Sequence, residues 1–194
     1  MEDVFNKIIS LVKTTTSETK DNHVKFSDQN YKAFEFNKDN FHLIQNSENK
    51  TNKIAFIDGG SSEIIKSANF SLSLIRVYHS IFQNSKRIKS NKREFYAFTN
   101  AIDKDNEIFY NTELLGMDNM IPDKNDLLLS SFDETIKQGI TRANISSVSN
   151  PVRRFSELKA ATKLIDDLGK DDVIVLDGSL QCTFTNEKKY MDNL

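Results

Sequence analysis

The sequence predicts an α/β fold: one mixed sheet with three antiparallel strands, a crossover helix and a further parallel strand. The apolar run Lys53–Asp58 and its later counterpart Asp172–Asp177 are each followed by glycine. Short β-branched runs with polar and glycine boundaries are typical of buried strands. Between them, Val152–Gly169 has helical spacing. Because a helix is the usual connection between parallel strands, we expect the two Asp-bearing strands to be parallel neighbours.

The chain of 194 residues is long enough for one domain with a proper core and an appendage. We expect residues 1–50 to form a helical and irregular N-terminal appendage, and residues 51–194 to form the core domain. Helix-spaced apolar residues predict a short amphipathic helix over 1–12, whereas 31–45 is an ambiguous, strand-like stretch.

Charge and composition narrow the function classes. A net charge of −2 gives no global positive field for nucleic acid. With only one cysteine, the chain has no internal disulfide and no cysteine-based zinc cluster. No apolar run is long enough to span a bilayer, and the first residues lack a signal-peptide pattern. We therefore expect a cytoplasmic protein without membrane association.

The first Asp-bearing strand should end at Asp58 and turn on the glycines that follow it. Strands are predicted at 68–81 and 94–102, and their short links indicate an antiparallel meander. Between them, 86–93 is rich in lysine and arginine: it is either a solvated hairpin turn or a nucleic-acid contact. Its candidate contact residues are Arg87, Lys89 and Arg93. The spacing of apolar residues in 123–139 predicts another helix.

One carboxylate lies on the core-facing side of the predicted Val152–Gly169 helix. At about 100° per residue, its apolar residues fall within an arc of roughly 120° that includes Glu157. A carboxylate on such a stripe is costly unless it is paired or holds a metal. Two alternatives therefore stand: Glu157 pairs with Arg153 or Arg154, or it binds a metal. Both arginines are also candidates for nucleic-acid contact.

Parallel neighbouring strands would place Asp58 and Asp177 side by side, with Glu157 facing them from the helix. Carboxylates about 4 Å apart repel by a few kcal/mol per pair at a protein-like dielectric, so such a cluster calls for cations or protons. Oxygen-only ligands select Mg²⁺ or Mn²⁺ over zinc. Two such ions suit phosphodiester cleavage, in which one activates water and the other stabilises the leaving oxygen.

The order of elements resembles the ribonuclease H-like fold, and three motifs resemble those of the NurA nuclease family: Phe56–Ser61, Arg154–Leu158 and Val175–Leu180. The resemblance extends roughly from Lys53 to Gln181. It implies a manganese-dependent DNA nuclease that acts on single strands and 5′ ends, and that works as a dimer with a HerA-type hexameric ATPase in DNA end processing. It further implies that Asp58, Glu157 and Asp177 are the acidic metal ligands and catalytic residues, with Mn²⁺ or Mg²⁺ as cofactor.

The chain also departs from that family. NurA-like chains continue well past the second Asp-Gly-Ser and add a late histidine, whereas only Gln181–Leu194 follow here and none of the three histidines takes that place. We therefore expect that this chain alone is not a self-sufficient nuclease. A further strand would begin near Leu180–Phe184, and an apolar surface would be exposed where a covering helix belongs.

Two other functions remain open. Ile57–Glu63 resembles the phosphate-cradling loop of actin-like or exopolyphosphatase-like ATPases, in which backbone amides bind phosphate. Those loops usually place a residue between the aspartate and the first glycine. The other alternative is a catalytically degenerate binding subunit of a nuclease–translocase complex. Metal-dependent cleavage, ATP turnover and partner binding without turnover would distinguish the three.

Overall fold

The structure is a computed structural model that describes residues 2–17, 39, 41–43, 51–116, 122–179 and 181–194. The chain divides into two units, Met1–Ser47 and Glu48–Leu194. In the first unit, helix α1 spans Glu2–Ser17, so the predicted N-terminal helix is confirmed and is longer than expected. Most of the strand-like stretch 31–45 lies outside the described residues.

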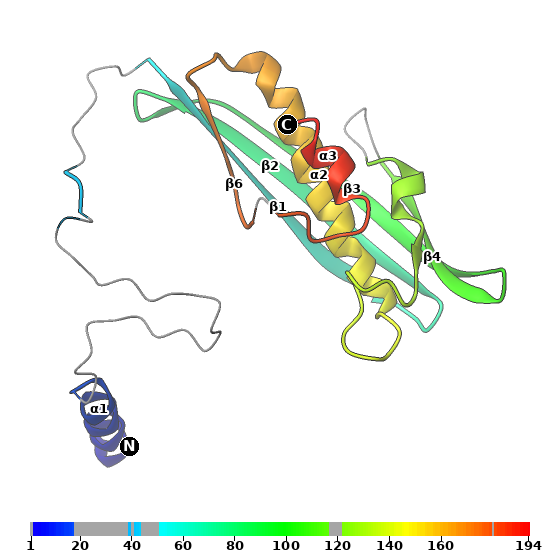
Figure 1. Ribbon diagram of the computed structural model, residues 1–194, viewed down its shortest axis with the longest axis horizontal. Coiled ribbons are helices and arrows are strands. Elements are labelled where there is room, and N and C mark those ends of the chain that lie inside the picture. The colour runs from blue at the N-terminus through cyan, green and yellow to red at the C-terminus, as the bar shows by residue number, and fades with distance from the viewer. Residues whose placement is uncertain (1, 18–38, 40, 44–50, 117–121, 180) are drawn as a thin grey trace. The chain divides into compact units, whose positions relative to one another are not determined.

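The second unit is built on a six-stranded mixed sheet with the order β5-β4-β3-β2-β1-β6, curled into a half-barrel (Figure 1). Its strands are β1 (Lys53–Lys66), β2 (Phe70–Gln83), β3 (Lys86–Lys104), β4 (Glu107–Leu115), β5 (Leu129–Ser130) and β6 (Val173–Leu176). Consecutive strands from β1 to β5 pair antiparallel, and β6 pairs parallel with β1 at the other edge. The predicted α/β class, the meander and the parallel last strand are confirmed.

Two tight hairpins shape the meander. Asn84 and Ser85 connect β2 to β3, and Asp105 and Asn106 connect β3 to β4, all with positive φ. Such left-handed pairs match the twist of the flanking strands, and Asn and Asp tolerate them best. The basic segment 86–93 is therefore the first half of β3, and its prediction as a hairpin turn is wrong. The sequence prediction also missed β4, although its Asp-Asn pair is followed by strand-like alternation.

β1 does not end at Asp58, contrary to the prediction. It continues through Gly59 and Gly60 to Lys66, because β2 pairs with it along this whole length and engages its backbone groups in the ladder. β6, by contrast, pairs with β1 only from Ile54 to Ile57. Asp58 thus lies where the parallel pairing stops and β1 becomes an edge strand.

The helix predicted over 123–139 is wrong. This segment contains the short 3₁₀ helix η2, Lys124–Leu127, then β5 and turns, and a second 3₁₀ helix, η3, follows at Ile145–Val148. The side chain of Asp123 accepts a hydrogen bond of 3.0 Å from the backbone N–H of Asn125. Asp133 binds the N–H of Thr135 in the same way at 2.8 Å. Such local side-chain bonds compete with helical backbone bonds, which explains the failure.

Helix α2, Ser149–Leu164, covers one face of the sheet and continues into the 3₁₀ helix η4, Ile165–Asp167 (Figure 1). It begins three residues before the predicted Val152 and ends before Gly169. Buried apolar residues of α2 meet those of the strands in two clusters. The α2 members are Val152, Phe155, Leu158, Ala160, Ala161 and Leu164. The face of the sheet that α2 covers is therefore its buried, inner face.

Among the described residues, 181–184 form no strand, contrary to the prediction, and a short helix follows them. Helix α3 spans Glu187–Met191, and the ring of Tyr190 stacks on Phe155 of α2 with 4.6 Å between centroids. Phe184 and Met191 add to the core cluster under α2. Among the described residues, no helix is long and apolar enough to cross a membrane.

Candidate functional site

Asp58 and Asp177 each come directly after the last paired residues of the parallel β1–β6 ladder. The β1–β6 register pairs Ile57 with Leu176, and the two aspartates are the next residues along each chain. Ala55 and Ile57 are buried under α2, so strand alternation places Asp58 on the opposite face of the sheet. Asp177 lies just after the end of β6 and before Gly178, whose φ is positive. Both aspartates are exposed, and their carboxylates accept no hydrogen bond from the described residues.

Glu157 approaches β1 from the helix side. Its side chain is 4% exposed and lies directly over Gly59, where a Cβ atom would be 2.5 Å from the Glu157 Oε1. Only a glycine leaves this space. Arg153 donates a hydrogen bond to the Glu157 carboxylate and another of 3.3 Å to the carbonyl of Gly59, and Arg154 forms a longer ion pair of 3.7 Å. Of the two alternatives for Glu157, the structure shows the arginine pairing.

Burial and the neighbouring arginines shift the pKa of Glu157 in opposite directions. Burial raises the pKa of this carboxyl above its ordinary value, and the charge of Asp58 adds to the rise. The guanidinium groups of Arg153 and Arg154 oppose it but do not cancel it. An added cation near Glu157 would favour its ionised form.

The three predicted ligands are not assembled as a metal centre. Within the part of the chain that the structure describes, no group of three or more His, Cys, Asp or Glu side chains could hold a metal ion. The sheet contributes to this, because Asp58 projects on one face while Glu157 lies on the other, held by Arg153. The donor chemistry, carboxylate oxygens alone, still fits Mg²⁺ or Mn²⁺. The triad therefore stays a prediction that requires Glu157 to leave Arg153.

The predicted basic contacts are divided between the two faces. Arg87 donates a 3.3 Å hydrogen bond to the hydroxyl of Tyr78, which pairs with Asp58 in the β1–β2 register, so Arg87 shares the face of the aspartate pair. Lys89 instead forms a 2.6 Å ion pair with Asp167 of η4, on the helix side. Arg93 and Arg153 also lie on the helix side, since Arg93 pairs with the buried Val77 and Arg153 belongs to α2.

Arg154 is a buried structural residue. It is 7% exposed and donates to Glu187, which is 0% exposed, at 2.8 Å. It also donates to the carbonyls of Asp177 and Ser179, at 3.3 and 2.8 Å. Arg154 therefore positions the segment after β6 and does not present its guanidinium to a nucleic acid, contrary to the prediction. The sequence prediction missed Glu187 because nothing in the short polar tail distinguishes a buried acid from an exposed one.

Other functional candidates on the aspartate-bearing face were missed as well. Arg76 of β2 and Lys92 of β3 are exposed there, and both pair with Glu94. Phe56 and Tyr96, 44% and 45% exposed, lie on the same face by strand alternation. Period-two alternation through β1, β2 and β3 was the signal that could have found them.

The phosphate-cradling loop of the ATPase alternative is not formed. Gly59 and Gly60 are extended residues of β1 in regular register with Val77 and Arg76 of β2. Their amides therefore belong to a strand and not to a loop that wraps phosphate.

No protein family, no curated protein and no solved structure matches this chain.

Proposed function

We propose that this chain is the nuclease-like domain of a divalent-metal-dependent DNA nuclease, with ribonuclease H-like strand order and NurA-like motifs. The β1–β6 register supports this proposal, because the parallel pairing runs up to Ile57 and Leu176, the residues directly before Asp58 and Asp177. Two adjacent carboxylates without a hydrogen-bond partner repel each other, and a divalent cation relieves that repulsion.

Asp58 and Asp177 would hold the Mn²⁺ or Mg²⁺ ion, and Glu157 would join them only by leaving Arg153 and reaching past Gly59 from the helix side of β1. When bound, the ion supplies an activated water and stabilises the leaving oxygen of a phosphodiester. Arg153 keeps the buried Glu157 paired until then. Arg154 fixes the backbone that presents Asp177.

The proposed substrate is single-stranded DNA, including 5′ ends. Surfaces that bind single strands combine cationic groups for the backbone with aromatic rings on which bases stack. The aspartate-bearing face offers both, with Arg76, Arg87 and Lys92 beside the exposed rings of Phe56 and Tyr96. These residues support recognition of one strand across the sheet.

A dimer and a HerA-type hexameric ATPase are the proposed partners in DNA end processing. Ile54, Val173 and Val175 are exposed apolar residues on β1 and on the edge strand β6. A strand edge with exposed apolar side chains is suited to association with another polypeptide. We propose that full activity needs such a partner.

A second candidate is a non-catalytic binding subunit of a nuclease–translocase complex. The ion pair between Arg153 and Glu157 favours it, because that pair takes one of the three acids out of the proposed metal site. In this case the DNA-binding face would be retained while cleavage is lost.

The test is incubation of labelled single-stranded DNA with the purified chain in Mn²⁺, Mg²⁺ or EDTA. We expect cleavage in Mn²⁺ that falls below about 1% of wild type in Asp58→Asn and in Asp177→Asn, since each change removes an anionic ligand. Asp103→Asn, an exposed aspartate elsewhere on β3, is the matched control and should keep its activity.

A second readout separates the two candidates. Mn²⁺ should raise the melting temperature of the wild type and of Asp103→Asn, but not of the other two variants, because ligands that bind the folded state stabilise it. Cleavage that persists in EDTA would contradict the nuclease proposal. DNA binding that depends on Arg87, without cleavage or Mn²⁺ stabilisation, would establish the binding subunit instead.

A further inference from the structure

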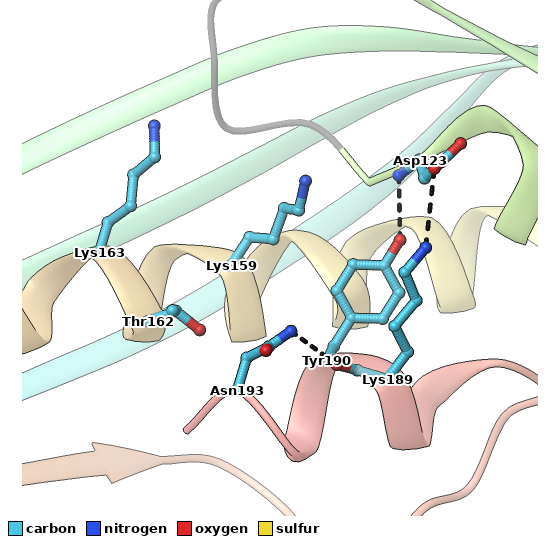
Figure 2. A pocket seen from close by; sticks show the side chains of 7 residues that line it. All are labelled: Asp123, Lys159, Thr162, Lys163, Lys189, Tyr190 and Asn193. Atoms are coloured by element: carbon cyan, nitrogen blue, oxygen red, sulfur yellow. Dashed lines mark hydrogen bonds and ion pairs between the residues drawn. The ribbon is translucent and has the colours of Figure 1, made fainter.

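His79 is a buried histidine on the inner face of the sheet. It lies on β2, opposite Ile57 of β1 and Asn91 of β3, and it is 6% exposed. Its Nε2 atom is buried and has no hydrogen-bond partner among the described residues. The polar side chains between α2 and α3 differ in this respect, since Figure 2 shows Asn193 and Tyr190 bonded to neighbouring residues. His79 is thus a buried titratable group with an unsatisfied nitrogen.

The residues nearest His79 along its strand are apolar. Val77 and Ile81, its neighbours on the same face of β2, belong to a buried hydrophobic cluster. Ala161 and Leu164 of α2 belong to the same cluster and cover this face of the sheet. A charged imidazolium is costly in such surroundings, because burial removes the water that would stabilise it. The surroundings therefore favour the neutral ring.

The charged groups that face His79 come from β3 and from the 3₁₀ helix η4. Lys89 and Arg93 of β3 lie on either side of Asn91 on the same face, and both charges disfavour an imidazolium. Asp167 of η4 favours it, but this carboxylate already forms a 2.6 Å ion pair with Lys89. Burial is the largest cause, and together with the two cations it lowers the pKa of His79 below its ordinary value.

Protonation changes what the ring of His79 requires. A neutral imidazole can leave Nε2 as an acceptor, whereas an imidazolium has a donor at both nitrogens. The buried Nε2 would then carry an N–H without an acceptor, which is unfavourable. The new charge would also lie beside Lys89, the residue that binds η4 to the sheet. Both effects are relieved when η4 moves away from the sheet and water reaches the ring.

The segment that supplies Asp167 also leads to β6. Lys89 binds the Asp167 carboxylate, and the Nζ of Lys53 donates a 2.8 Å hydrogen bond to the Asp167 carbonyl. Further along, Asp172 accepts a 2.7 Å hydrogen bond from the backbone N–H of Lys53. β6 follows directly, so η4 and β6 share one attachment to the sheet.

We propose that His79 is a pH-sensitive switch that controls how firmly η4 and β6 are attached to the sheet. The neutral ring allows them to pack, and protonation in mild acid loosens them. The switch itself does not depend on the nuclease proposal. Its consequence for the candidate metal site rests on that proposal, since Asp177 directly follows β6 and would lose its place when β6 loosens.

The sign of the pH effect follows from the protons that each state binds. The folded pKa of His79 lies below the unfolded value, about 6.5, so the unfolded chain binds this proton more readily. The contribution of neutral His79 to stability is therefore complete above about pH 6.5 and is lost as the pH falls through the lower folded pKa.

The experiment is hydrogen exchange of the full chain, without metal or DNA, at about pH 7.5 and about pH 5.5, with rates corrected for the intrinsic effect of pH. We expect the protection of residues 165–176 to fall at least about threefold in acid relative to that of β3 and β4. His79→Leu, which cannot titrate, should abolish this fall. His42→Leu changes an exposed histidine and is the matched control, which should keep the fall.

Several results would overturn the proposal: unchanged protection of 165–176 in acid, an equal fall in every strand, or the same fall in His79→Leu. NMR titration of the ring signals of the wild type is an independent measurement that does not require the variant to fold. A pKa of His79 at or above about 6.5 would also overturn the proposal. None of these readouts involves cleavage, so a failure of the nuclease proposal is seen separately from a failure of this one.

Discussion

The two Asp-Gly segments have similar sequences and different structures. Asp58-Gly59 continues as an extended strand, whereas Asp177-Gly178 leaves its strand with a positive φ of 94° at the glycine. The difference comes from their partners. β2 pairs along all of β1, but β6 has only the four-residue pairing with β1, after which Arg154 binds the carbonyls of Asp177 and Ser179. Tertiary pairing, and not the local Asp-Gly signal, determines which segment turns.

The two glycines are consequently required for different reasons. Gly59 has an ordinary strand conformation, and its missing side chain makes room for Glu157. Gly178 has open space around its Cα, and its requirement is the left-handed backbone itself. Gly59 allows close contact between α2 and β1, and Gly178 allows the backbone to turn at the end of β6.

The largest effect should come from removing the arginine that ends the second segment. Arg154→Ala leaves the fully buried Glu187 carboxylate without its ion pair and frees the carbonyl of Asp177. Breaking one side of a buried pair typically costs about 3–5 kcal/mol, and we expect a loss of this size in the free energy of unfolding from denaturant titration.

The matched control is Arg76→Ala, whose guanidinium is exposed and pairs with Glu94 on the sheet surface. It should cost no more than about 1 kcal/mol. Equal losses in the two variants would mean that Arg154 does not hold the end of β6, and the account of why Asp177-Gly178 turns would fail.

Glycine substitutions test the comparison directly. Gly59→Ala places a Cβ against the Glu157 carboxylate and should cost about 1–3 kcal/mol by overpacking. Gly60→Ala meets nothing within 4 Å and should be neutral or stabilise by up to about 1 kcal/mol. Gly178→Ala should cost about 1–3 kcal/mol through backbone strain. Thermal melts measure all three, and a Gly60→Ala as destabilised as Gly59→Ala would refute the fit of Glu157 over Gly59.

The sequence predicted the elements that local pattern and long-range order both favour. The meander, the α2 helix with its buried Glu157 and the parallel β1–β6 pair were all accessible, because apolar periodicity and the crossover rule agree there. The failures occur where pairing or side-chain bonds override the pattern. The Asx turns at Asp123 and Asp133 replaced an expected helix, and the pairing with β2 carried β1 past its glycines.

The site was less predictable than the fold. The parallel pairing that brings the two Asp-bearing segments together follows from strand order, but the face on which Asp58 projects depends on whether β1 turns at Gly59. A strand that continues keeps strict alternation, and this alternation separates Asp58 from Glu157. The burial of Arg154 likewise depends on α3, which no sequence pattern indicated.

The smallest expected effect is on the pH dependence of stability. It compares the wild type, in which Glu157 lies against the Asp58-Gly59 segment, with a variant that lacks this carboxylate. Burial raises the folded-state pKa of Glu157 above its unfolded value, so the folded protein holds this proton more tightly. Its contribution to stability is complete below the unfolded pKa, about 4.3, and is lost as pH rises through the higher folded pKa. Glu157→Gln cannot titrate there, so its stability relative to wild type should increase as the pH rises above about 4.3.

Denaturant titrations at several pH values measure this difference. In the Asp58→Asn background, the relative stability of Glu157→Gln should change over a narrower pH range. The reason is that the Asp58 charge is one cause of the raised pKa of Glu157. The opposite slope, with Glu157→Gln losing stability relative to wild type as pH rises, would mean that Arg153 and Arg154 outweigh burial and hold the pKa of Glu157 low. Glu157 would then be a tightly held ion-pair residue, and its release to a metal site with Asp58 and Asp177 would be correspondingly disfavoured.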